Sequence, residues 1–357
     1  MKNVDIRKKE REFDMKRISV RFSGMTGEIS PNNNFIMKIL GQRYEIELSE
    51  NPDFLIYSVN SQDYLDYHCP RIYFTPENLV PDFNICDYAI GFHYLDFDDR
   101  YIRFPLYLVS DFTAYNKDDY ASDLQLAIHK HEKAEEYFKK KVEFCAFVYS
   151  NGQAAKCRED FFNKLSEYKQ VNSGGGYKNN VGGPVESKLD FQAKHKFVIA
   201  FENTSTPGYT TEKIVHAFAA GAVPIYWGDP EIGRVFNTKA FINCHDYGVT
   251  AYGDNTVAFE KIINEIERLD SDDKAYLEML SQAAFVEGYN IEEEKKKLEN
   301  FLCHIFDQEP EIAYRRNRYY WGERYERKQR IGNKFYWMIR KLIPIRDDIK
   351  RLLKNIK

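Results

Sequence analysis

The residues with the clearest chemical potential lie in one stretch, 201–213, which is rich in Thr, Pro and Gly. A buried strand is expected to end at Phe201, and a helix is expected to begin after the loop, with a threonine as its cap. The start of a helix exposes free N–H groups and a partial positive charge, so this turn, with Lys213 beside it, is suited to hold a phosphate. Glu212 could accept hydrogen bonds from ribose or sugar hydroxyls. An ordinary capped helix with a solvated Glu–Lys pair fits the same residues equally well.

The elements around this loop alternate in type. Strands are expected over 145–149, 196–201, 223–227 and 240–243, and helices over 157–168, 211–220 and 256–269. Such βαβ alternation predicts a parallel sheet covered by helices on both faces. Open sheets of this kind bind ligands at the carboxyl ends of their strands, which is where the 201–213 loop would lie.

The first third of the chain carries a second set of strand signals. Strands are expected over 17–22, 44–48, 54–59, 71–74, 88–92 and 101–108, a helix over 35–40, and a polar helix over 120–141. Two further helices, 272–284 and 292–305, are expected beside or across the second half. We therefore expect an α/β protein with domains at 1–142 and 143–310, followed by a tail at 311–357, and a cleft between the two sheets.

Composition excludes several other classes of protein. The 357 residues have a formal net charge of −4, so the whole chain does not demand a nucleic-acid partner. The six cysteines are scattered and lack the close pairs of a zinc or redox site, so we expect reduced thiols in a cytosolic protein. No signal peptide is expected in residues 1–21, and no apolar run is long enough to cross a bilayer.

The last segment differs from the rest in charge. Residues 315–357 carry 15 Lys and Arg against 4 Asp and Glu, a net of +11, which leaves 1–314 at −15. Apolar residues recur at alternating steps of four and three and form a heptad seam: Ile331, Phe335, Met338, Leu342, Ile345, Ile349, Leu352 and Ile356. A helix of this type can dimerise, lie on an anionic membrane, or fold back on the body, and Pro344 predicts two helical pieces. Its basic and aromatic residues would also suit single-stranded nucleic acid, but the acidic body opposes that partner.

A longer pattern surrounds the 201–213 loop. Phe-Glu-Asn-Thr at 201–204 is followed by Tyr209, by Thr-Glu-Lys at 211–213 and by Val-Pro-Ile-Tyr-Trp-Gly at 223–228. In residue identity and spacing this resembles the signature of the α1,3-fucosyltransferase family. Other stretches extend the resemblance over most of 70–305; they lie at 73–78, 87–92, 95–107, 147–151, 174–176 and 241–246.

The resemblance implies a GT-B fold, with two Rossmann-like domains facing a cleft, an acceptor-binding first domain and a second domain that holds GDP-fucose as donor. By position, Arg158 and Lys213 would neutralise the diphosphate, while Asn203, Tyr209 and Glu212 would line the nucleotide-sugar pocket. The implied reaction is inverting transfer of L-fucose to a glycan that contains N-acetylglucosamine or glucose, in α1,3 and/or α1,4 linkage, with no cofactor required. Two cations are suited to stabilise the charge that develops on the leaving phosphate.

Inverting transfer also needs a base to take the proton of the acceptor hydroxyl. Members of the family carry a Glu two positions after a Gly-Phe pair, whereas this chain has Tyr94 there, after 91–92. A tyrosine is a poor base at neutral pH because its usual pKa is about 10. His93 and Asp96 are the candidate bases: strand alternation puts Asp96 on the face of Tyr94, while His93 has the more suitable usual pKa.

The triplet Asp96-Phe97-Asp98 is formally the Asp-x-Asp that some glycosyltransferases use to hold a metal ion. It lies within the first-domain motif and not after a nucleotide-binding strand, so we predict no metal site.

The leading interpretation is a cytoplasmic fucosyltransferase, peripheral to the inner membrane face, that acts on an oligosaccharide or glycolipid. The alternatives are a GT-B transferase that uses another nucleotide sugar, and a module that binds nucleic acid or membrane through its basic tail. The sequence leaves open the acceptor, the regiochemistry and the oligomeric state.

Overall fold

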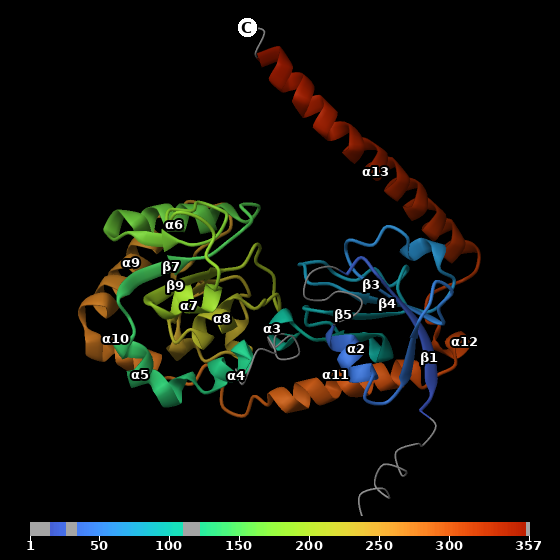
Figure 1. Cartoon of the computed structure of the whole chain (residues 1–357), viewed down its shortest axis with the longest axis horizontal. Helices are drawn as coiled ribbons and strands as arrows, with labels where there is room; N and C mark the ends of the chain where they lie inside the picture. The colour runs from blue at the N-terminus through green and yellow to red at the C-terminus, as the bar shows by residue number, and fades with distance from the viewer. Residues whose placement is uncertain (1–14, 26–33, 110–121, 355–357) are drawn as a thin grey trace, which may run out of the picture. The chain divides into compact units, whose positions relative to one another are not determined.

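The computed structural model describes residues 15–25, 34–109 and 122–354. They form two compact units, each built on a parallel sheet (Figure 1). The first unit takes the described residues of Met1–Ile90, Phe97–Ile102 and Glu299–Lys357, and the second takes those of Gly91–Asp96 and Arg103–Leu298. These units differ from the expected boundaries at 142 and 310, because the chain crosses between the two sheets more than once.

The second unit holds a five-stranded sheet with the order β11-β10-β9-β7-β8, and its neighbouring strands pair in parallel. Its strands are β7 (Glu143–Phe147), β8 (Val171–Ser173), β9 (His195–Phe201), β10 (Val223–Trp227) and β11 (Ile242–Asn243). Its helices are α3 (Leu106–Val109), α4 (Asp123–Ile128), α5 (Ala134–Lys139), α6 (Lys156–Tyr168), α7 (Lys188–Ala193), α8 (Lys213–Ala219), α9 (Thr256–Ser271) and α10 (Asp273–Leu280). Short 3₁₀ turns lie at Lys130–Lys133, Ile232–Arg234, Thr238–Ala240 and Cys244–Tyr247.

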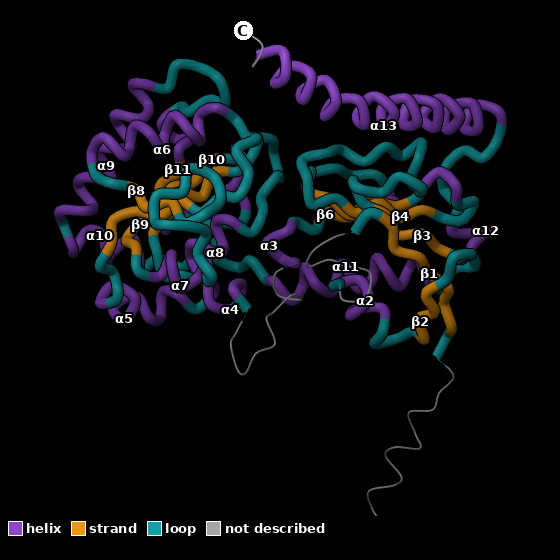
Figure 2. Tube along the Cα trace, turned by 45° about the horizontal axis from the view of Figure 1, so that its top comes forward, coloured by secondary structure: helices purple, strands orange, loops and turns teal. Residues whose placement is uncertain are grey.

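Strand alternation decides which helices cover which face of this sheet. The larger residues of β7 and β9, such as Phe147 and Phe197, share one apolar cluster with residues of α6, α9 and α10. The smaller Ala146 and Val198 face the other side, where they pack with Ala217 of α8. Helices therefore cover both faces of the sheet, as expected, and Figure 2 shows its strands between them.

The first unit holds a six-stranded sheet with the order β2-β1-β3-β4-β5-β6. Its strands are β1 (Arg17–Ser23), β2 (Glu45–Leu48), β3 (Phe54–Tyr57), β4 (Arg71–Phe74), β5 (Tyr88–Gly91) and β6 (Tyr101–Arg103), with 3₁₀ turns at Tyr64–Asp66 and Asp98–Arg100. Its helices are α2 (Phe35–Leu40), the second half of α11 (Ile291–Phe306), α12 (Pro310–Ala313) and α13 (Tyr320–Lys354). Phe306 of α11 packs on Phe54 of β3 at 4.8 Å between ring centroids. The helix expected over 292–305 thus contributes to the core of the first unit.

Two expected elements are wrong in part. The strand expected over 101–108 ends at Arg103, and α3 follows, because Pro105 lacks an N–H for the sheet but fits the start of a helix. The polar helix expected over 120–141 is divided into α4, a 3₁₀ turn and α5, and its first two residues lie outside the described part. The division follows from Lys130, which turns inward and donates to the Leu280 carbonyl at 2.8 Å.

The start of the basic tail is part of the first unit. Asp87 is fully buried and pairs with the guanidinium of Arg316; it also accepts from the backbone N–H groups of Arg315 at 2.8 Å and Arg316 at 2.9 Å. Glu326 of α13 pairs with the buried Arg71 at 2.8 Å and with Arg316 at 3.2 Å. These buried charges need each other, since a buried ion that loses its partner destabilises a protein by about 3–5 kcal/mol. The expectation that 311–357 follows the domains as a tail is therefore wrong for its first third.

Helix α13 runs without a break through Pro344, so the expected two helical pieces are wrong. The proline removes one backbone hydrogen bond, and the turns on either side stay helical. At the start of the seam Ile331, Phe335 and Met338 are each more than half exposed. The side chains of the later seam positions lie outside the described part of the structure. Among the described residues, no helix combines the length and the apolar character that a membrane crossing requires.

We predict that the point of truncation decides whether the first unit stays folded. Deleting 315–357 removes both Arg316 and Glu326, which leaves Asp87 and Arg71 buried without their partners, and should lower the unfolding midpoint by about 10 °C. A chain that ends at Tyr336 keeps these pairs and should melt within about 2 °C of the full chain. Scanning fluorimetry of the three proteins makes the comparison. Equal midpoints for both truncations would show that the buried pairs do not stabilise this unit.

Candidate active site

The loop between β9 and α8 is closed by a buried carboxylate. Glu202, which directly follows β9, is completely buried and accepts hydrogen bonds from the Thr211 N–H and hydroxyl, each at 2.7 Å. Lys213, the first residue of α8, donates to the same carboxylate at 3.1 Å. Burial raises the pKa of Glu202, and the groups bonded to it oppose that rise. One acidic side chain thus ties the end of the strand to the start of the helix.

Lys213 lies between two carboxylates. Its ammonium is 3.1 Å from Glu202 and 3.6 Å from Glu212. Burial alone would lower the pKa of Lys213, but these two neighbours raise it above its usual value, so the ammonium stays charged. Burial likewise opposes ionisation of Glu212, yet the charge of Lys213 holds its pKa well below the usual range. Glu212 is therefore a charged acceptor, and 27% of its side chain is exposed.

The expected threonine cap of α8 is wrong. The residue before the helix is Glu212, and its side chain makes no capping hydrogen bond. The threonine hydroxyls bind carboxylates instead: Thr211 donates to Glu202, and Thr210 donates to Asp229 at 3.1 Å. The loop is thus held by two acidic side chains at its base and not by a helix cap.

Asp229 is the second anchor of the loop, and sequence reasoning missed it. It is 1% exposed and also accepts from the Gly208 N–H at 2.9 Å. Gly208 adopts φ of +89°, and a Cβ there would lie 2.4 Å from the Phe92 carbonyl oxygen. Only glycine fits so close a contact in that conformation. Asp229 lies two residues after β10, at the carboxyl edge of the sheet, and this position could have marked it in the sequence as a candidate site residue.

Arg158 is buried beside the same loop. Its guanidinium donates to the Asn203 side-chain oxygen at 2.9 Å and to the Asn151 carbonyl at 2.6 Å, and it lies 4.3 Å from the Tyr149 ring centroid. It is 1% exposed, which rules out an ordinary surface arginine. The structure thus brings Arg158 and Asn203 together, and Asn203 directly follows Glu202. Tyr209 is also buried, and its ring packs edge-on against Phe92 at 4.9 Å.

The segment of the candidate bases belongs to the second unit and not to the first. Strand β5 ends at Gly91, so the strand alternation used to assign faces to Tyr94 and Asp96 does not apply. The Tyr94 ring is held between the guanidinium groups of Arg103 and Arg234, each 4.4 Å from its centroid, and burial raises its pKa. A tyrosine in this setting is no base at neutral pH.

The two candidate bases differ in environment. His93 is half-buried, and burial together with the charge of Arg103 lowers its pKa. Its Cα lies 3.3 Å from where a Cβ on Gly208 would stand, which places it next to the 201–213 loop, named the donor loop for its expected role. Asp96 is exposed. The structure therefore puts His93 nearer to the loop and leaves Asp96 in solvent.

The Asp-x-Asp triplet is divided between the units, with Asp96 in the second and Phe97 and Asp98 in the first. The Phe97 ring packs on Phe83 at 4.6 Å. Within the described residues, no three His, Cys, Asp or Glu side chains gather as a metal site would require.

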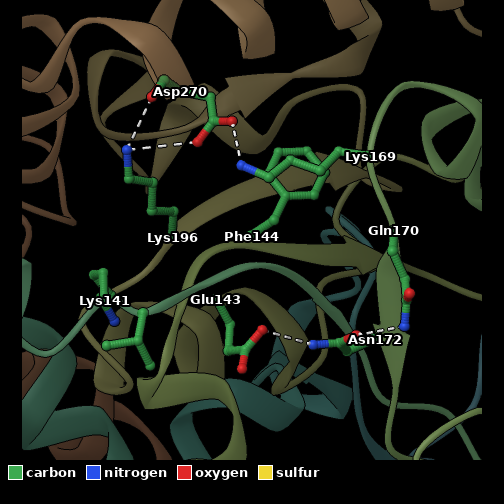
Figure 3. Close-up of a pocket in the computed structure, with 9 residues that line it drawn as sticks. Lys141, Glu143, Phe144, Lys169, Gln170, Asn172, Lys196 and Asp270 are labelled. Carbon is green, nitrogen blue, oxygen red and sulfur yellow. Dashed lines mark hydrogen bonds and ion pairs between the residues drawn. The ribbon is translucent and has the colours of Figure 1, made fainter.

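A hollow of about 440 Å³ lies at the opposite edge of the second sheet, where β7, β8 and β9 begin (Figure 3). Its cationic groups already have partners: Lys169 and Lys196 pair with Asp270, at 2.8 and 3.5 Å, and Lys141 donates to the carbonyls of Ala193 and Ala220. Parallel sheets bind ligands at the carboxyl ends of their strands, so this hollow is not the active site.

Comparison with known proteins decides the family. Residues 20–110 match the family model of the alpha-(1,3)-fucosyltransferase FucT N-terminal domain. Residues 138–320 match the family model of the glycosyltransferase family 10 (fucosyltransferase) C-terminal domain. The chain belongs to glycosyltransferase family 10. The second match contains Arg158, the 201–213 loop and Asp229, and the first contains the segment of the candidate bases.

Individual relatives agree with this family 10 assignment. The alpha-(1,3)-fucosyltransferase FucT of Helicobacter pylori is 37% identical over 275 residues, which are 70% of this chain and 55% of that protein. Alpha-(1,3)-fucosyltransferase B of Drosophila melanogaster is 28% identical over 40% of this chain and 33% of its own length. The chain thus spans about half the length of these curated relatives, or less. A crystal structure of an alpha1,3-fucosyltransferase with GDP-fucose superposes with a TM-score of 0.61 at 30% identity, covering 80% of this chain and 91% of that one.

We predict that Arg158→Met weakens GDP binding by about 10- to 100-fold, because it removes a charge-assisted contact. Calorimetry with GDP measures the effect, and Lys156→Met is the matched control, since Lys156 is an exposed cation at the first position of α6 that pairs with Asp160. Lys213 is a less clean probe, because its removal leaves the buried Glu202 without a cation. Equal GDP affinity in Arg158→Met and the control would remove Arg158 from the donor site.

Proposed function

We propose that this chain transfers L-fucose from GDP-fucose to a hydroxyl of an N-acetylglucosamine- or glucose-containing glycan, with inversion and in α1,3 and/or α1,4 linkage. The observation that carries the proposal is the pair of cations, Arg158 and Lys213, fixed at the start and at the end of one loop at the carboxyl edge of the second sheet. The likeness to a fucosyltransferase structure with GDP-fucose supports the donor, and the identity to the Helicobacter pylori enzyme supports the linkage.

In the proposed reaction the acceptor oxygen bonds to C1 of fucose while the bond from C1 to the β-phosphate oxygen breaks. The electron pair leaves with GDP, whose growing negative charge Arg158 and Lys213 would stabilise. Glu212, ionised and partly exposed, would accept hydrogen bonds from ribose or sugar hydroxyls. The two cations supply the positive charge that this step needs.

The acceptor proton would pass to His93 or Asp96. The lowered pKa keeps His93 neutral near pH 7, which is the state that can accept a proton, and its backbone lies against Gly208 of the donor loop. Asp96 remains the alternative, because it is an exposed carboxylate in the same segment.

A transfer assay tests the proposal. We expect fucose to be transferred from GDP-fucose to N-acetyllactosamine, with the product in the α configuration by NMR, and no transfer from GDP-mannose or UDP-glucose. Activity should persist in excess EDTA. Transfer from another nucleotide sugar in place of GDP-fucose would favour the related GT-B transferase, and loss in EDTA that Mn²⁺ restores would give the metal a role.

The same assay distinguishes the bases. The two variants are His93→Gln and Asp96→Asn. The variant that removes the true base should lose about 100-fold or more in kcat and keep its affinity for GDP. Asp98→Asn is the control, because Asp98 is an exposed carboxylate of the neighbouring turn. Normal kcat in both variants would place the base elsewhere.

We further propose that the chain works in the cytoplasm at the inner membrane face, held through residues 315–357. The net charge of +11 on this segment and the exposed Ile331, Phe335 and Met338 support an anionic membrane surface as its partner. A homodimer through the heptad seam is the alternative that the same residues allow. The acidic remainder of the chain does not favour nucleic acid.

Vesicle sedimentation tests the tail. The chain that ends at Tyr336 lacks a net charge of +5, which at about 1 kcal/mol per basic residue should reduce binding to anionic vesicles by about 1,000-fold at low salt. Binding of the full chain should weaken at high salt, because screening shortens the reach of the charges. Equal sedimentation of both chains would reject the membrane role, and a halved mass of the shorter chain in light scattering would identify a dimer seam.

A further inference from the structure

A second ammonium group lies beside α8, the helix that follows the donor loop. Lys188, the first residue of α7, has its Nζ 2.8 Å from Nδ1 of His216 on α8. The other ring nitrogen of His216, Nε2, lies 3.2 Å from Oδ2 of Asp123, the first residue of α4. Three helices of the second unit thus meet in one chain of side-chain contacts, and neither the resemblance nor the proposed reaction gives these residues a role.

The hydrogen-bonding chemistry of lysine and histidine decides which atoms carry the protons in this chain of contacts. A lysine ammonium only donates, so Nδ1 of His216 must accept, and the ring proton must sit on Nε2 and point to Asp123. The imidazole is then neutral, which agrees with its pKa, lowered to about 3 by burial and by the charge of Lys188. The histidine therefore acts as a neutral bridge that holds the ammonium of Lys188 in place through Asp123.

The charges of the donor loop indicate a role for the ammonium of Lys188. Glu202 and Glu212 are two carboxylates that share the single ammonium of Lys213. Lys213 lies closer to the buried Glu202, which also binds Thr211. The ion pair between Lys213 and Glu212 is therefore the weaker of the two.

His216 lies one helical turn after Glu212, and its backbone N–H donates to the Glu212 carbonyl at 2.8 Å, so Lys188, bound to His216, lies on the side of α8 that carries Glu212. Burial lowers the pKa of Lys188 and the charge of Glu212 opposes that effect, while the charge of Lys188 helps to lower the pKa of Glu212. Lys188 thus adds a second positive charge near Glu212, besides that of Lys213.

We propose that Lys188, held by the His216 bridge to Asp123, is a positioning residue of the donor site that orients the Glu212 side chain toward the nucleotide sugar. The inference rests on the proposed role of Glu212 in binding GDP-fucose. It assigns no contact between Lys188 and the donor: the effect of Lys188 passes through Glu212.

A double-mutant cycle tests this. Calorimetry with GDP-fucose is carried out on the full chain, Lys188→Met, Glu212→Gln and the double variant. We expect Lys188→Met to weaken binding by about tenfold in the native background and by less than about twofold when Glu212 is already Gln. A merely structural lysine would weaken binding equally in both backgrounds, and that result would overturn the proposal.

Two further variants keep the test decisive. Lys194→Met, at an exposed lysine just after α7, should bind GDP-fucose as the full chain does. Asp123→Asn keeps the shape of the bridge but removes its charge, so it replaces Lys188→Met in the cycle should that variant fail to fold, with an expected loss of about threefold. A native chain that does not bind GDP-fucose would refute the proposed function; native binding with unchanged affinity in Lys188→Met would refute only the role of Lys188.

Discussion

The carboxylate of Glu202 is completely buried at the end of β9, and the donor loop takes its shape from the need to satisfy it. An ionised carboxylate in the interior is tolerated only when hydrogen bonds and an opposite charge replace the water it has lost. Thr211 and Lys213 supply these groups, so the loop must return to the strand from which it began. The ammonium of Lys213 is thereby fixed in place by the fold itself.

The same constraint extends to the rest of the site. With the loop closed on Glu202, Gly208 is brought against the backbone of Phe92, and Asp229 holds it there. This contact places the segment of the candidate bases in the unit that carries the donor loop, although that segment follows a strand of the other sheet. The candidate bases and the cations proposed to bind phosphate thus belong to one unit, which would favour catalysis by orientation.

A second buried carboxylate organises the first unit in a similar way. Asp87 binds the backbone and side chain of Arg316, which fixes where the chain enters α13. The helix begins as part of the fold, anchored by Glu326, and only then presents the exposed seam. Residues 315–357 have the composition of a basic tail, but their first part belongs to the folded first unit. In both units a buried charge, and not apolar burial alone, decides how a distant part of the chain is attached.

The sequence by itself determined most of the strands and the larger helices, because alternating and helical apolar periods are local properties of the chain. The family resemblance also predicted one donor site made of Arg158, Asn203, Tyr209, Glu212 and Lys213, because their positions match the motif of that family. The sequence did not reveal the anchors Glu202 and Asp229, the bridge from Lys188 to Asp123, or the attachment of Arg316. Those depend on hydrogen bonds and ion pairs between residues that are separated in the chain and meet only when it is folded. Burial then decides which of them must be bonded, and burial is a property of the tertiary structure alone.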